Sequence, residues 1–176
     1  MNNSKKLKVA SIILARSGSK SLKNKNLSNL DGKPLIYYAI EAAQSSKRIN
    51  RIFVSTDSKK IKKIALRYGA EVPFLRKKKF SKDTSTTEET LRNFLDELDS
   101  RENYKPDIIV YFQTTDIFRN KKLINQCIKN LTDNNKIDSS FIATPTHKNF
   151  WKISEKKPYR INKHNVYFPR QKKTNL

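Results

Sequence analysis

The sequence predicts a three-layer α/β/α protein, in which helices cover both faces of a mostly parallel sheet. Three observations lead to this fold class. Strand-like and helical patterns alternate along the chain, which is the order of βαβ units. The expected strands are continuous apolar runs, as in residues 9–14, and such runs indicate strands buried on both faces. Polar clusters follow the strands, where ligands bind in sheets of this kind.

The first expected strand, residues 9–14, is followed by a loop and then by a helix. Pro34 can begin this helix, because its fixed φ and its missing N–H suit the first helical turn. Apolar residues then recur at helical spacing and predict one buried face, formed by Leu35, Ile36, Ala39, Ile40 and Ala43.

A second strand and helix follow. Ile49–Ser55 is the second expected strand, and either Asp57 or Ser58 can cap the helix after it. That helix ends at Gly69, because glycine readily adopts the left-handed conformation common after helices. Val72–Leu75 is expected to be a short extended piece.

The next helix has a clear N-terminal signal. Thr86 or Thr87 can cap it, and Glu89 lies three residues after Thr86, which is the spacing of a capping box. The remaining expected elements are a strand at Ile108–Phe112, a helix at Leu123–Leu131, a strand at Ser139–Thr144 and a short strand at Tyr159–Ile161.

The charge of the chain points to anionic ligands. Its 38 Lys and Arg residues face 16 Asp and Glu residues, which gives a formal net charge of +22. A nucleic acid, an anionic membrane surface or an acidic substrate would suit such a charge. The alternative is that the many lysines reflect the amino-acid bias of an AT-rich genome. Nucleic-acid binding is not expected, because the cations are spread out and the aromatic residues form no repeated surface pattern.

The sequence predicts a cytoplasmic protein that makes no use of a membrane. The apolar run after the basic N-terminus, residues 9–14, is too short for a signal peptide or a membrane span. The chain has one cysteine, Cys127, so no disulfide can form within it, which fits a reducing compartment.

The loop after the first strand is the main candidate site. Ala15–Asn26 contains four cations, three serines and one glycine. Small residues let backbone N–H groups approach a ligand, and the cations neutralise several negative charges at once. Walker A loops and dinucleotide-binding fingerprints need two or three spaced glycines, whereas this loop has only Gly18. The loop therefore predicts a polyphosphate site of another kind.

A series of short motifs runs along the chain: Ile13–Lys20 with Lys25-Asn26-Leu27, Gly32–Ile36, Val54–Asp57, Gly69–Arg76, Asp83-Thr84, Gln113-x-Thr115-x-x-x-Arg119 and Pro169-Arg170-Gln171. In these motifs and their order the sequence resembles the acylneuraminate cytidylyltransferases, which are the CMP-sialic acid synthetases and their relatives. The resemblance implies a Rossmann-like nucleotidyltransferase fold. It also implies a reaction in which CTP and a nine-carbon 2-keto sugar acid give the CMP-sugar and pyrophosphate. Mg²⁺ and a homodimer are further expectations from the resemblance.

The resemblance also assigns the nucleotide half of the site. Arg16, Ser19 and Lys25 would hold the triphosphate, and Arg16 and Lys25 would stabilise the charge that shifts to pyrophosphate. Asn26 would contact the ribose or the phosphates. The residues around the cytosine would be Arg76, Ser85 and Thr87.

For the sugar half, the resemblance assigns Gln113 to the sugar acid and both Lys152 and Arg170 to its carboxylate. It divides the chain into a nucleotide-binding α/β domain, residues 1–147, and an incomplete sugar-binding and dimerisation segment, residues 148–176.

The chain departs from the family pattern after the third strand. Gln-Pro-Thr-Ser-Pro-Leu-Arg is usual there, but residues 113–119 read Gln-Thr-Thr-Asp-Ile-Phe-Arg. Loss of both prolines predicts a less rigid turn. The new Asp116 is either a ligand for Mg²⁺ or an exposed turn residue.

A second departure concerns catalysis. The family's metal-binding aspartates would lie beyond Leu176, so no residue of this chain is assigned to a metal. We therefore expect either a fragment of a longer enzyme or a truncated product with weak catalysis. The alternative function is a module that binds CTP without turnover, and a less favoured one is a basic nucleic-acid-binding protein.

Overall fold

The computed structural model describes residues 7–18, 22, 24–143, 151–154 and 157–160, the last two ranges by their backbone only. The chain divides into two compact units, residues 1–140 and 141–176. The expected domain boundary at residue 147 lies outside the described residues and stays a prediction.

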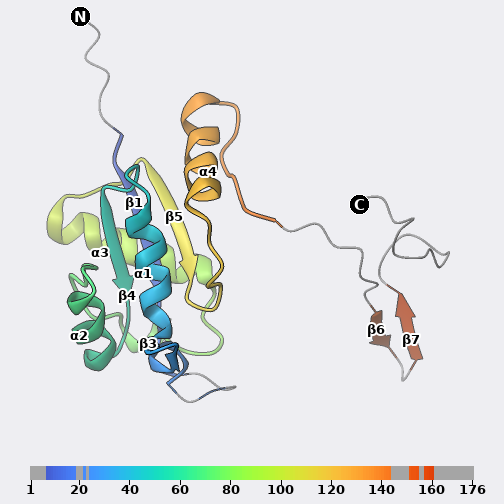
Figure 1. The fold of residues 1–176 in the computed structure, drawn as a ribbon. Helices are drawn as coiled ribbons and strands as arrows, with labels where there is room; N and C mark the ends of the chain where they lie inside the picture. The colour runs from blue at the N-terminus through green and yellow to red at the C-terminus, as the bar shows by residue number, and fades with distance from the viewer. Residues whose placement is uncertain (1–6, 19–21, 23, 144–150, 155–156, 161–176) are drawn as a thin grey trace, which may run out of the picture. The chain divides into compact units, whose positions relative to one another are not determined.

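A parallel sheet forms the centre of the first unit (Figure 1). Its strands are β1 (Val9–Leu14), β4 (Arg51–Ser55) and β5 (Ile108–Gln113), in the order β4-β1-β5. Both neighbours run parallel to β1. The three strong apolar runs of the sequence therefore form the sheet, as predicted, because only covered strands can bury both faces.

Four helices surround this sheet: α1 (Leu35–Ser45), α2 (Lys59–Arg67), α3 (Thr87–Glu102) and α4 (Lys121–Asp133). Ser58 rather than Asp57 caps α2, since its hydroxyl accepts a hydrogen bond from the N–H of Ile61. The predicted capping box is present at α3, where the backbone and side-chain groups of Thr86 and Glu89 bond reciprocally.

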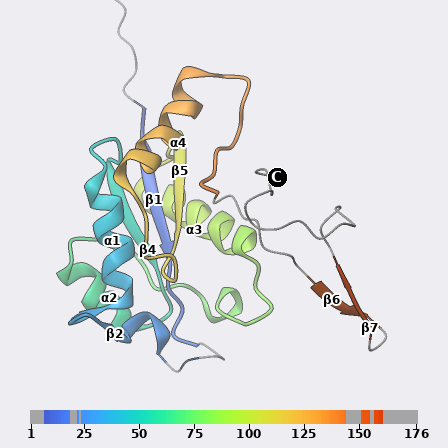
Figure 2. The same cartoon turned by 45° about the vertical axis from the view of Figure 1, so that its right-hand side comes forward.

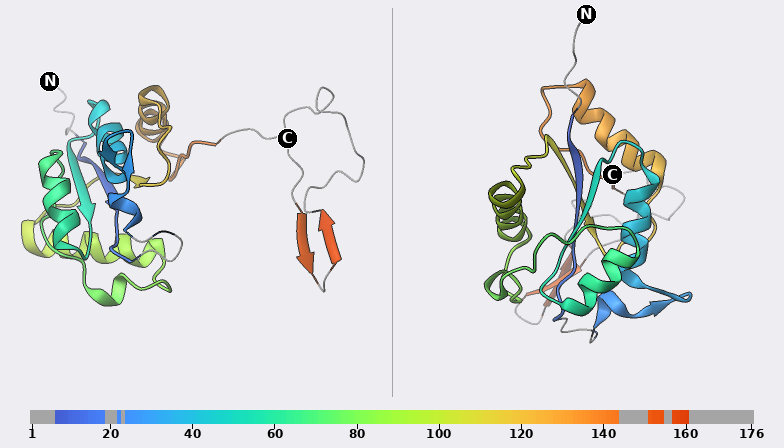
Figure 3. Two further views of the ribbon diagram at one scale, coloured as in Figure 1. Left: turned by 60° about the horizontal axis from the view of Figure 1, so that its bottom comes forward. Right: turned by 90° about the vertical axis from the view of Figure 1, so that its left-hand side faces the viewer.

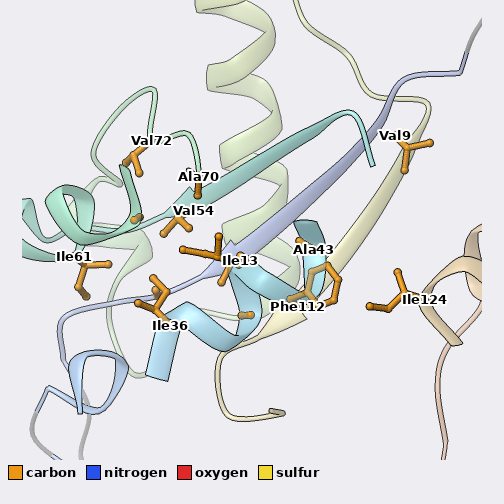
Figure 4. Packing of buried hydrophobic residues seen from close by; sticks show 14 of the residues in the cluster. Val9, Ile13, Ile36, Ala43, Val54, Ile61, Ala70, Val72, Phe112 and Ile124 are labelled. Carbon is orange, nitrogen blue, oxygen red and sulfur yellow. The ribbon is translucent and has the colours of Figure 1, made fainter. Parts of the chain in front are cut away.

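The helices cover both faces of the sheet, so the three-layer prediction is confirmed (Figures 2 and 3). One apolar cluster joins the sheet to α1, α2 and α4, and Figure 4 shows Ile13, Val54 and Phe112 among its members. The other cluster joins the opposite face to α3 through Phe53 and Phe94. Strand alternation explains this division, because neighbouring residues such as Phe53 and Val54 point to opposite faces.

The strand order defines where a ligand would bind. The chain passes from central β1 to β4 on one side, and later enters β5 on the other side. Connections that leave a central strand in opposite directions open a crevice at the carboxyl ends of the strands. The loop after β1 and the turn after β5 meet at this edge.

Short elements complete the described chain: the 3₁₀ turns η1 (Lys25–Leu27) and η2 (Lys78–Phe80), and the two-residue strands β2 (Asn29–Leu30) and β3 (Lys33–Pro34). The β2–β3 hairpin was not predicted. Its turn residues Asp31 and Gly32 have φ values of 47° and 75°, and an Asp-Gly pair favours such a turn.

The expected strand at 139–144 is wrong over the residues that the structure describes, because 139–143 form no strand. Phe141 is 83% exposed, so this apolar part of the segment is not buried in a hydrophobic core. A strand requires a pairing partner as well as apolar residues, and residues 139–143 pair with none of the described strands.

In the second unit, β6 (Trp151–Ser154) pairs antiparallel with β7 (Lys157–Arg160). The expected short strand at 159–161 is confirmed for residues 159 and 160, and Ile161 lies outside the described residues.

Candidate functional site

A pocket of about 200 Å³ lies at the carboxyl end of β1, beside the N-terminus of α3. Segments that are far apart in the sequence contribute to it. Four residues that were assigned to the nucleotide line this one pocket: Arg16, Arg76, Ser85 and Thr87. The structure therefore brings these four residues together.

Arg76 is a buried cation in the wall of the pocket. The residue is only 9% exposed, and its guanidinium donates to the carbonyl of Ser55 at 2.6 Å and to that of Phe80 at 3.4 Å. Its Nε is buried without a hydrogen-bond partner. Burial lowers the pKa of Arg76 to about 10, so the side chain is still a cation at neutral pH. A buried cation held by carbonyl groups is well placed to receive an anionic or carbonyl-bearing ligand.

Arg16 also lines the pocket, at the start of the loop after β1. Its guanidinium forms an ion pair of 2.5 Å with Asp83, and both side chains are partly exposed, at 33% and 40%. Both residues also line the pocket. A polyanionic ligand would therefore compete with the Asp83 carboxylate for the Arg16 cation.

The N-terminus of α3 provides a second kind of positive potential. Thr86 and Thr87, at the first turn of this 16-residue helix, line the pocket. The helix dipole and the N–H groups outside the capping box attract negative charge to such an end, whereas the acidic Glu88 and Glu89 of the first turn offset part of this potential. The Ser85 hydroxyl donates to the carbonyl of Lys79 at 3.0 Å, which fixes the segment before the helix.

Asn26 lies beneath the loop and joins it to the turn after β5. The residue is 6% exposed, and its Nδ2 donates to the carbonyl of Arg16 at 2.8 Å. Its Oδ1 accepts from the Thr114 hydroxyl at 2.6 Å. Both atoms of the amide are thus engaged inside the protein.

Asp57 anchors the same loop from the end of β4. Its two carboxylate oxygens accept hydrogen bonds from the N–H and the hydroxyl of Ser17, each at 2.7 Å. The interpretation of Asp57 as a helix cap is therefore replaced by a role in holding the loop, since Ser58 takes the cap.

The turn after β5 is held by Arg119, whose side chain is 7% exposed. Its guanidinium donates to the carbonyls of Gln113, at 2.5 Å, and of Asp116. It also lies 4.8 Å from the centre of the Phe112 ring, and burial lowers its pKa. These contacts restrain the turn in place of the two missing prolines.

The other assigned residues are distributed as follows. Gln113 ends β5 with an exposed side chain, and Lys25 lies half-buried in η1. Ser19 and Arg170 lie outside the described residues. Lys152 belongs to β6, but its side chain lies outside what the structure describes.

Sequence reasoning missed several residues of this region. Tyr111 lines the pocket from β5, and strand alternation, which places it opposite buried Phe112, could have indicated this. The hydrogen bonds of Asp57 and Thr114 could not be predicted from a local sequence pattern, because their partners lie 40 and 88 residues away.

A metal centre is not assembled in the part of the chain that the structure describes. No three His, Cys, Asp or Glu side chains there are grouped so that they could hold an ion. Asp116 has a 62% exposed side chain and lies 3.5 Å from the Nε of Arg119. Within the same described residues, no helix is both long and apolar enough to cross a bilayer.

Solved structures of low sequence identity share this fold. A CMP:2-keto-3-deoxy-manno-octonic acid synthetase complexed with CTP is 20% identical, with a TM-score of 0.62 over 73% of this chain and 48% of that chain. A 4-diphosphocytidyl-2C-methyl-D-erythritol synthase is 11% identical, with a TM-score of 0.68 over 89% of this chain and 68% of that chain. These likenesses confirm the Rossmann-like nucleotidyltransferase fold.

Curated proteins found by sequence comparison have higher sequence identity to this chain than these solved structures have. N-acylneuraminate cytidylyltransferase A of Danio rerio is 36% identical over 148 residues, 84% of this chain and 33% of that protein. CMP-N,N'-diacetyllegionaminic acid synthase of Legionella pneumophila is 37% identical over 123 residues, which are 70% of this chain and 53% of that protein. Pseudaminic acid cytidylyltransferase of Campylobacter jejuni is 33% identical over 135 residues, which are 77% of this chain and 56% of that protein.

The chain thus spans 33% to 56% of the length of these three relatives. Residues 10–174 match the protein-family model described as "Cytidylyltransferase". Because this match covers nearly the whole chain and agrees with both the relatives and the fold, the chain belongs to the cytidylyltransferase family.

Proposed function

We propose that this protein is a nucleotidyltransferase that activates a nine-carbon, sialic-acid-like keto acid with CTP. The products are the CMP-sugar and pyrophosphate. Membership of the cytidylyltransferase family supports the choice of reaction. The relatives named for acylneuraminate, diacetyllegionaminic acid and pseudaminic acid support the class of sugar.

The observation that carries the proposal is the buried Arg76 cation. It lies in a pocket with Arg16, at the carboxyl end of a parallel sheet. A cation that is 9% exposed and lacks a partner for Nε is costly to keep in an empty fold. A ligand with carbonyl and phosphate oxygens would satisfy this cation, and cytidine triphosphate has both.

The dimensions of the pocket favour a base as its occupant. A volume of about 200 Å³ suits one ring rather than a whole nucleotide, and Tyr111 contributes an aromatic wall. We place the cytosine there, against Arg76, with the triphosphate extending toward Arg16 and Lys25. The resemblance that assigned Ser85 and Thr87 to the base agrees with this placement.

The reaction then needs little covalent chemistry from the protein. The anomeric oxygen of the sugar acid forms a bond to the α-phosphorus, and the bond from this phosphorus to the bridging oxygen of pyrophosphate breaks. The proton of the anomeric hydroxyl is released to solvent. Arg16 and Lys25 would neutralise the negative charge that accumulates on pyrophosphate, which lowers the barrier by electrostatic stabilisation. Gln113, Lys152 and Arg170 would orient the sugar acid.

Several parts of the proposal rest on the resemblance alone. Mg²⁺ would reduce the negative charge of the triphosphate, and we assign it no protein ligands among the described residues, where no three suitable side chains are grouped. A homodimer and a cytoplasmic location are likewise proposed. Sedimentation of the purified chain at several concentrations would test the dimer.

The function is tested by calorimetric titration with CTP and by pyrophosphate release in the presence of Mg²⁺. The acids to supply are N-acetylneuraminate, legionaminate, pseudaminate and 3-deoxy-octulosonate. We expect CTP binding and release that depends on one of the nine-carbon acids. Binding without release would identify a CTP-binding module, and no binding of CTP would overturn the proposal.

A further inference from the structure

A buried chain of hydrogen bonds connects the turn after β5 with the loop after β1. The Thr114 hydroxyl donates to Asn26 Oδ1 at 2.6 Å, and Asn26 Nδ2 donates to the Arg16 carbonyl at 2.8 Å. Thr114 is 5% exposed and Asn26 is 6% exposed. The bond between Thr114 and Asn26 is buried, so water has little access to replace it, and the bond from Asn26 to Arg16 is partly buried.

The burial of this chain makes its geometry specific. An amide in the interior loses free energy when its donor or acceptor has no partner, so one orientation of Asn26 is strongly preferred. That orientation fixes the carbonyl of Arg16. Asp57 holds the next residue, Ser17, through its N–H and its hydroxyl. The start of the loop is thus restrained from two sides.

The donor itself is also held in place. Arg119 is 7% exposed at its side chain and donates to the carbonyl of Gln113, the residue before Thr114. Thr114 is therefore presented by a restrained turn. The family motif of the sequence analysis has proline at this position, and proline has no side-chain donor, so the motif itself does not supply this bond.

We propose that Thr114 is a positioning residue for the triphosphate loop, acting on Arg16 through Asn26. The inference rests on the proposed function of that loop. It also gives a physical path between the two substrates, because Thr114 follows Gln113, which we assign to the sugar acid. Loss of the hydroxyl should loosen Arg16 and leave the pocket for the base intact.

The test compares Thr114→Val, which keeps the shape and removes the donor, with Thr114→Ser, which keeps the donor. Calorimetry should show CTP affinity about tenfold weaker in Thr114→Val and within about twofold of wild type in Thr114→Ser. Cytidine lacks phosphates, so its affinity should be the same in all three proteins. Equal losses for CTP and cytidine would indicate general damage and overturn the inference.

A double-mutant cycle with Arg16→Ala distinguishes positioning from a merely structural role. If Thr114 acts through Arg16, Thr114→Val should weaken CTP binding by less than about threefold in the Arg16→Ala background. If the losses of CTP affinity in the two single variants simply multiply in the double variant, the two residues act independently and the proposal is contradicted. Thermal unfolding confirms that each variant is folded at the assay temperature, and Thr114→Ala replaces Thr114→Val should the latter not fold.

The two proposals fail in different ways. Absence of CTP binding in the wild-type chain would overturn the proposed function and this inference with it. Normal CTP binding by Thr114→Val, with a functional wild type, would overturn the inference alone.

Discussion

Two basic hollows of the first unit differ in how their cations are held. One is the pocket that contains Arg16 and Arg76. The other, of about 410 Å³, lies between the connection after α1 and helix α4, and its cations are Arg48, Lys121, Lys122 and Lys129. The second hollow is larger and carries more positive charge, yet all four of its cations are exposed. Arg76, by contrast, is 9% exposed and bonded to backbone carbonyls.

This difference teaches that charge alone does not mark the site in a chain of net charge +22. Exposed lysines keep their water and their rotamer freedom, so they attract any anion weakly and select none. A buried guanidinium lost its hydration and its rotamer freedom when the protein folded, before any ligand binds. It can therefore discriminate between ligands by geometry.

The sharpest test of the comparison replaces the buried cation. Arg76→Met should weaken CTP binding by at least about thirtyfold, because truncating a buried charged partner typically costs 2–5 kcal/mol. Stability should change little, because the Ser55 carbonyl keeps its bond from the Ala15 N–H and because replacing a buried charge by an apolar side chain is often neutral or stabilising. Calorimetry and thermal unfolding measure the two effects.

Arg92→Met is the matched control for that variant. Arg92 lies on α3 with a side chain that is 72% exposed and pairs with Glu88, so its removal takes away the same charge at the surface. CTP affinity should stay within about twofold of wild type. A similar loss in both variants would mean that net charge, not the pocket, binds CTP.

A smaller effect of opposite sign is expected at Asp83. Its carboxylate pairs with Arg16 at 2.5 Å, so a triphosphate must displace it. Because partly exposed ion pairs contribute up to about 1 kcal/mol, Asp83→Asn should raise CTP affinity by up to about fivefold. Glu88→Gln, in the exposed pair with Arg92, is the control and should change nothing. Weaker binding in Asp83→Asn would instead make Asp83 part of the binding site.

Much of the fold could be predicted because its signals are local. The apolar runs at β1, β4 and β5, the capping box of α3 and Gly69 after α2 all operate within a few residues. The expected strand at 139–144 failed because pairing is a long-range property. An apolar stretch such as Phe141-Ile142 does not reveal whether a partner strand is present.

The site, like the fold, has features that local sequence patterns predict and features that depend on long-range contacts. The loop after β1 was recognisable from its composition, and the resemblance added Arg76, Ser85 and Thr87, which the fold gathers into one pocket. The bonds that hold this loop link residues 40 and 88 positions apart. One sequence has no pattern that pairs Asp57 with Ser17 or Thr114 with Asn26, so only the structure could reveal them.

The central claim is that CTP binds where cations are restrained at the carboxyl end of the sheet. Two charge-matched double variants test it most directly: Arg16→Ala/Lys25→Ala in the site and Lys122→Ala/Lys129→Ala in the hollow along α4. At physiological salt, the first should weaken CTP binding by at least about thirtyfold and the second by less than about twofold. Equal losses in the two variants, or a larger loss in the second, would contradict the account.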